Sequence, residues 1–116
     1  MELAKLSDQA IREIVEPIMD NLIQGSTEIN HAKHTRDFTD RLKTIVSETY
    51  LDCVCCDYQS RWGFFTHREC VAIFRRPESI AVVWKQWCSQ MPGELVAELV
   101  LVEHHGRYQV DHVMVY

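Results

Sequence analysis

The feature that most constrains this fold is a change of hydrophobic period at Gly63. Before it, apolar residues recur at steps of about three to four residues, which is typical of helices that bury one face. After it, aromatic and β-branched residues are frequent and apolar positions alternate with polar ones, which is typical of strands. Helices first and strands last predict an α+β fold, in which N-terminal helices pack on a curled antiparallel sheet of about four strands.

A long first helix is predicted near the N-terminus. Ser7 can cap a helix that runs to about Gln24, and Gly25 follows as a natural stop. Pro17 lies inside the pattern and should bend the helix, because proline lacks a backbone donor. The predicted buried stripe consists of Ile11, Ile14, Val15, Ile18, Leu22 and Ile23.

Shorter helical segments follow. Ser26 or Thr27 could cap a short helix through Lys33, and Asp37 or Thr39 could begin a second pattern. That second pattern contains Phe38, Leu42, Ile45 and Val46. A third helix, capped by Ser47, is predicted over residues 48–61, with the stripe Leu51, Val54, Cys55, Tyr58 and Trp62.

Four strands are predicted after Gly63, at residues 65–74, 80–88, 95–104 and 107–116. The segment Arg76-Pro77-Glu78-Ser79 is a turn signal, and Met91-Pro92-Gly93-Glu94 should break the second strand. The dipeptide His105-Gly106 predicts a two-residue hairpin between the last two strands.

This hairpin register assigns side chains to two faces. The larger and more apolar face should pack on the helices, and it carries Leu95, Ala97, Leu99, Leu101, Tyr108, Val110, His112, Met114 and Tyr116. The other face is half valine and half polar, and it carries Val96, Glu98, Val100, Val102, Gln109, Asp111, Val113 and Val115. We expect a homodimer through this outer face.

His112 is the ionisable residue on the predicted helix-facing side. A histidine among aliphatic side chains needs a hydrogen-bond partner. It could be a core histidine bonded to a backbone carbonyl or to Tyr58, or it could be a polar group in the wall of a cavity.

The composition bounds the function. The chain has 116 residues and a net charge of −5, which fits one domain over residues 1–116. Because acidic and basic residues are interspersed, we expect no nucleic-acid binding. The N-terminus continues into an amphipathic helix and no run could span a bilayer, so we expect no signal peptide, no membrane partner and a cytoplasmic location.

The cysteines and histidines do not form a recognisable metal motif. Cys53, Cys55 and Cys56 cluster without a second pair, whereas a structural zinc site needs four ligands. We expect reduced thiols for these three and for Cys70 and Cys88. His31 and His34 would share one helical face, and we expect them to be solvated. No metal and no cofactor are predicted.

Aromatic residues concentrate where the helices meet the strands. Ordinary core packing explains most such concentrations. A cluster of Tyr58, Trp84 and His112 would instead form a mostly apolar pocket with few polar groups, which is the usual form of a small-molecule site. The predicted pocket lining is Tyr58, Trp62, Trp84, Leu99, Tyr108, His112 and Met114.

Three segments carry a resemblance to a known superfamily: residues 21–26 (NLIQGS), residues 38–63, and residues 101–111, which end in a glycine-aromatic-x-valine hairpin. Together they resemble the nuclear transport factor 2-like cone fold, which includes ketosteroid isomerase and polyketide-cyclase-like (SnoaL-like) proteins, and within it a branch of unknown function. The resemblance implies a pocket between helices and sheet and frequently a homodimer. It implies no particular chemistry, because this fold hosts enzymes, binders and scaffolds.

The isomerases of that superfamily use an aspartate base with a tyrosine and aspartate pair. Asp111 falls on the outer face of the predicted register, which counts against this activity. We therefore expect a non-catalytic dimeric module that binds a small apolar ligand or serves an accessory role. The alternatives are an isomerase, cyclase or dehydratase with His112 as base and Tyr58 or Tyr108 as donor, and a scaffold with a filled cone.

Overall fold

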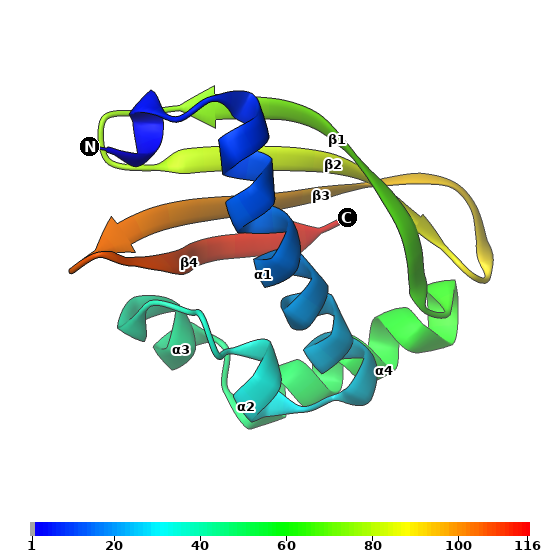
Figure 1. Ribbon diagram of the computed structural model, residues 1–116. Coiled ribbons are helices and arrows are strands. Elements are labelled where there is room, and N and C mark those ends of the chain that lie inside the picture. The colour runs from blue at the N-terminus through cyan, green and yellow to red at the C-terminus, as the bar shows by residue number, and fades with distance from the viewer. Residues whose placement is uncertain (1) are drawn as a thin grey trace.

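The computed structural model describes residues 2–116, and its helices precede a curled four-stranded sheet (Figure 1). The helical elements are a 3-10 turn at Leu3–Lys5, α1 (Asp8–Glu28), α2 (His31–His34), α3 (Asp40–Ile45) and α4 (Glu48–Trp62). The strands are β1 (Phe65–Arg75), β2 (Ile80–Cys88), β3 (Met91–His104) and β4 (Arg107–Val115). The strands are antiparallel in the order β1-β2-β3-β4, which confirms the predicted α+β class.

Side-chain caps start the helices. The hydroxyl groups of Ser7, Thr39 and Ser47 each accept a hydrogen bond from a backbone N–H in the first turn, and they start α1, α3 and α4 as predicted. The predicted cap of the short helix is wrong, because Asn30 caps α2 in place of Ser26 or Thr27.

The first helix is longer than predicted because Gly25 does not end it. The helix continues past Pro17 and Gly25 to Glu28, and Ile29 takes the left-handed conformation that closes it (φ 52°). Gly25 is needed for a close approach: an added Cβ would lie 2.5 Å from the backbone nitrogen of His34. The glycine therefore lets α2 pack directly on α1.

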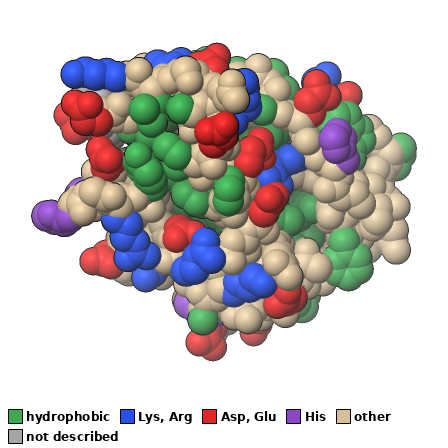
Figure 2. Space-filling view, viewed as in Figure 1, with side chains coloured by type: hydrophobic (Ala, Val, Ile, Leu, Met, Phe, Trp, Pro, Cys, Tyr) green, Lys and Arg blue, Asp and Glu red, His purple; other side chains and the backbone are tan. Residues whose placement is uncertain are grey.

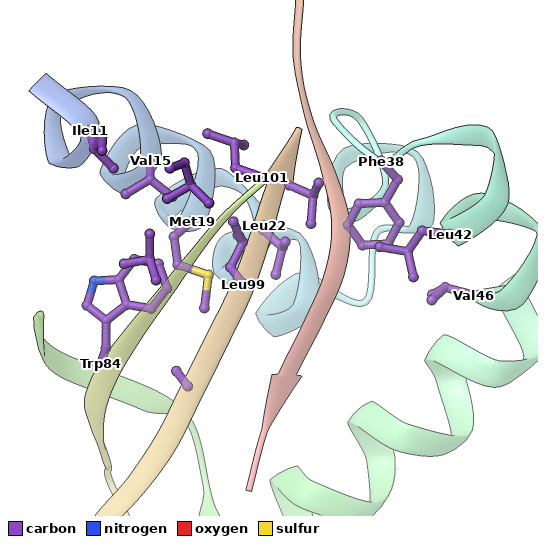
Figure 3. Packing of buried hydrophobic residues seen from close by; sticks show 14 of the residues in the cluster. Ile11, Val15, Met19, Leu22, Phe38, Leu42, Val46, Trp84, Leu99 and Leu101 are labelled. Carbon is purple, nitrogen blue, oxygen red and sulfur yellow. The ribbon is translucent and has the colours of Figure 1, made fainter. Parts of the chain in front are cut away.

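The buried core forms between α1 and the sheet (Figure 3). Ile11, Val15, Met19 and Leu22 of α1 face Trp84, Leu99 and Leu101 of the sheet, and Phe38, Leu42 and Val46 gather beside the last strand. The removal of this apolar area from water is the main contribution that holds the helices on the sheet.

A polar cluster fixes α1 across the strands. Glu16 accepts hydrogen bonds from the indole N–H of Trp84 (2.8 Å) and from the guanidinium of Arg68 (2.6 Å). Arg68 also pairs with Asp20 (2.6 Å), and only 13% of its side chain is exposed. Arg68 is largely removed from water, so its bonds to the half-buried Glu16 matter more than its pair with Asp20, which is 69% exposed.

The second strand ends at Cys88 as predicted, but residues 91–94 do not form the break after it. They belong to β3, and the turn between β2 and β3 is Ser89-Gln90. The pairing is irregular here, because Gln86 lies opposite Leu95 and Cys88 opposite Met91. A bulge leaves residues unpaired, which is how a strand accommodates Pro92 and Gly93.

The hairpin forms as predicted, but a bulge in β4 changes the faces beyond it. His104 lies opposite Arg107, and this register continues to Leu101 opposite Val110. Asp111 is then an extra residue, so that His112 lies opposite Val100.

The predicted faces are therefore wrong for the end of β4. His112, Met114 and Tyr116 point to the outer face of the sheet, whereas Val113 and Val115 pack against the core. The outer face, which points away from the helices, carries Val83, Val96, Glu98, Val100, Val102, His112, Met114 and Tyr116.

Replacing Gly25 with alanine should destabilise the protein, although alanine favours helices by about 1 kcal/mol over glycine. The added Cβ would collide with the backbone of His34, and overpacking of this kind costs about 1–3 kcal/mol. Chemical denaturation of Gly25→Ala should show a net loss, while Gln24→Ala at the exposed neighbouring position should not. A Gly25→Ala variant as stable as wild type would contradict the close approach.

Replacing Glu16 with alanine should lower the unfolding free energy by about 1–3 kcal/mol, because it leaves the Trp84 indole N–H and part of Arg68 without an acceptor. Glu13→Ala is the matched control on the same helix, since Glu13 is exposed and bonds only to Gln9 at 3.4 Å. Urea unfolding followed by tryptophan fluorescence measures both. Equal losses in the two variants would show that the cluster adds nothing.

Candidate functional site

A hollow of about 340 Å³ lies between α1, α4 and the end of β4. Its walls are mainly apolar, with Leu22 and Ile23 from α1, Leu51, Val54 and Trp62 from α4, Phe65 from β1, and Val113 and Val115 from β4. Mostly apolar walls with few polar groups are typical of small-molecule sites.

The rim of the hollow is open to solvent and carries exposed apolar side chains. Tyr50 and Val54 of α4 are 50% and 42% exposed, and Met114 of β4 and Tyr116 just after it are about half exposed. Asp57 and Arg61 also line the hollow, but they pair with each other at 2.6 Å. Figure 2 likewise shows acidic and basic side chains beside one another on the face that carries α1.

A buried polar network lies in the wall. The hydroxyl groups of Tyr58 and Ser26 are 2.6 Å apart, and Gln59 donates to the Tyr58 oxygen at 3.3 Å. The Ser26 hydroxyl also lies 3.4 Å from the Cys55 sulfur. Burial raises the pKa of both Cys55 and Tyr58, so the thiol and the phenol remain protonated at neutral pH.

His34 also lies in the wall, and it is 9% exposed. Its Nδ1 lies 2.9 Å from the Leu22 carbonyl oxygen, and its ring meets Phe38 edge-on with centroids 5.3 Å apart. Burial lowers the pKa of His34, outweighing the opposing effect of the Leu22 carbonyl, and nearby His31 lowers it further. The ring is therefore neutral at pH 7.

The structure brings together only part of the predicted pocket. Tyr58 and Trp62 line the hollow, and Met114 reaches its rim although it faces the outer side of the sheet. Trp84 and Leu99 lie in the sealed core instead, because their strands are covered by α1.

Tyr108 and His112 do not line the hollow. Tyr108 packs against the core at the hairpin end of β4. The bulge places His112 on the outer face, where its Nε2 lies 3.1 Å from a carboxylate oxygen of Glu98. The prediction that His112 faces the helices is thus wrong.

Sequence reasoning missed Ser26 and His34 as wall residues. Ser26 was predicted to follow the first helix, but it lies inside α1. His34 was predicted to be solvated together with His31, but it is buried because Gly25 lets α2 approach. Gly25 was the available signal, since a glycine can mark a close approach as well as a helix end.

The cysteines do not gather into a site. All five are free, and Cys53 and Cys56 are exposed on α4 while Cys55 is buried. Within residues 2–116, no three His, Cys, Asp or Glu side chains come close enough together to hold a metal ion. No helix in the described part of the chain has the length and apolar character to cross a membrane.

Comparison with known proteins adds information on the fold. A solved structure of Bd1075 from Bdellovibrio bacteriovorus is similar, with a TM-score of 0.54 and 8% sequence identity. The match covers 95% of this chain and 42% of that chain, so this chain spans less than half the length of that protein. At this identity the likeness shows the fold alone. No family profile matches the sequence, and no curated protein matches it.

The lowered pKa of His34 predicts a loss of stability in acid. Its unfolded value is near 6.5, so the unfolded chain binds the proton first, and the unfolding free energy should fall as the pH drops below 6.5 towards the folded pKa. In His34→Gln this part of the decline should disappear. Denaturation curves of wild type and His34→Gln between pH 8 and about 5 measure this. If the unfolding free energies of the two proteins fall equally with pH, the ring of His34 is not buried and neutral.

Proposed function

We propose that this chain is a non-catalytic binding module of the nuclear transport factor 2-like cone fold, which holds a small apolar ligand in the hollow. The observation that carries the proposal is the hollow itself, with apolar walls and a few buried polar groups on one side. The helix-first order and the curled four-stranded sheet support the choice of fold.

The polar groups favour binding over catalysis. The hydroxyl groups of Tyr58 and Ser26 bond to each other, and the charged pair Asp57 and Arg61 is mutually neutralised. A general base needs hydrogen-bond reach to a substrate in the pocket. His112, the base of the enzyme alternative, is on the other face of the sheet and bonds to Glu98.

The same proposal includes a homodimer through the outer face. The two central strands carry a row of valines there, at positions 83, 96, 100 and 102, of which Val96 is exposed and the others are half-buried, next to the exposed Met114 and Tyr116. Glu98 accepts from His112 at 3.1 Å and from the Tyr116 hydroxyl at 3.5 Å, so the central charge is partnered within the chain. An apolar patch with its charge already paired suits a subunit contact.

Binding of a neutral apolar dye such as Nile red tests the ligand site. Wild type should bind the dye, and Val54→Glu should weaken binding about tenfold or more, because a charge at the apolar wall must be desolvated. Ile45→Glu is the matched control, since Ile45 is an exposed helical residue that does not line the hollow. A wild type that does not bind, or equal weakening by both variants, would refute the proposal.

Sedimentation equilibrium tests the dimer. Wild type should be a dimer, and Val96→Glu should dissociate it, because the charge would lie in an apolar contact. Ile45→Glu on α3 should remain a dimer. A wild type that stays monomeric as its concentration rises would remove the outer-face contact from the account.

A further inference from the structure

We infer that Nε2 of His34 is the polar anchor of the hollow, and that it selects uncharged, mostly apolar molecules carrying one hydrogen-bond donor, a hydroxyl or an N–H group. This inference rests on the proposed function, because it names the class of ligand that the hollow would take. It follows from the tautomer of His34, from the position of its ring and from the way the neighbouring polar groups are used.

The tautomer is set by the Leu22 carbonyl. A carbonyl oxygen can only accept, so Nδ1 of His34, 2.9 Å away, carries the ring proton. The ring is neutral, and its second nitrogen therefore presents a lone pair. Nε2 is an acceptor that needs a donor opposite it.

The ring is held by its hydrogen bond to the Leu22 carbonyl and by its contact with Phe38. Gly25 lies against the backbone of His34, and Phe38 packs on the ring at 70°. No described residue between 2 and 116 bonds to Nε2. The only side-chain polar atom in this range that is both sealed from solvent and unpaired is Oε1 of Gln86. Nε2 of His34 has no hydrogen-bond partner and is not among the sealed atoms, so solvent can reach it. Because His34 lines the hollow, we place this opening on the side of the hollow.

The buried polar groups beside it in the wall are paired with one another. Tyr58 and Ser26 use their hydrogen-bonding capacity on each other, on Gln59 and on the sulfur of Cys55. Arg61 is committed to Asp57 at 2.6 Å, so the hollow does not offer a carboxylic acid an unpaired cation. A ligand with acceptors alone would set lone pair against lone pair at Nε2, which leaves a buried polar group unpaired and costs about 1–3 kcal/mol.

Two probes that differ by one methyl group test this selection: 4-propylphenol, which donates a hydrogen bond, and 4-propylanisole, which cannot. Titrations followed by ¹H–¹⁵N NMR give both affinities. The phenol should bind wild type about three- to tenfold more tightly, the value of one net hydrogen bond. The ¹⁵N resonance of Nε2 should shift on addition of the phenol and not on addition of the ether.

His34→Gln and the control His31→Gln complete the experiment. His31 lies one turn away and bonds to the Val46 carbonyl at 2.8 Å, so its loss should leave the preference for the phenol intact. His34→Gln should lose the preference; if that variant does not fold, the Nε2 resonance of wild type decides. Equal binding of the two probes with an unmoved Nε2 resonance would overturn the inference and leave the proposed function standing. If neither probe nor Nile red binds, the proposed function fails first.

Discussion

The bulge at Asp111 is the constraint on which the rest of the structure depends. Thr39 donates to the Asp111 carboxylate at 2.9 Å, and Arg41 donates to the same oxygen at 3.1 Å and also to the Asp111 carbonyl. Val110 beside it exchanges backbone hydrogen bonds with Asp37 and Thr39, which covers the edge of β4 at that point. The start of α3 thereby holds one extra residue in the last strand, and every side chain beyond it changes face.

Both proposed surfaces follow from that shift. Val113 and Val115 turn inward and close the hollow, while Met114 and Tyr116 turn outward and join the valines of β2 and β3. On the other side of the hollow, Gly25 brings α2 against α1 and so places His34 in the wall. The bulge and the close approach at Gly25 therefore build the site, and the Glu16, Arg68 and Trp84 cluster keeps α1 in position above it.

The sequence predicts the parts of the fold that depend on neighbouring residues. Ser7, Thr39 and Ser47 start their helices, and His105-Gly106 turns the hairpin, because caps and two-residue turns depend on short stretches of chain. The bulge was not predictable in this way. It is held by α3, which lies about 70 residues earlier in the chain.

The same distinction explains the candidate site. Tyr58 and Trp62 were found because helical periodicity places them on the inner face of α4. His34 was missed because its burial depends on how closely two helices approach, which Gly25 permits but its local sequence does not reveal. His112 was misassigned because one extra residue reverses a strand face.

Cross-strand nuclear Overhauser effects from Leu99 test the central claim most directly. The bulged register places Leu99 opposite Val113, and the backbone protons of these two residues should show strong contacts. A hairpin without the bulge would continue the pairing set by His104 and Arg107 and would place Leu99 opposite His112. Contacts from Leu99 to Val113 support the account, whereas contacts to His112 in their place would contradict it.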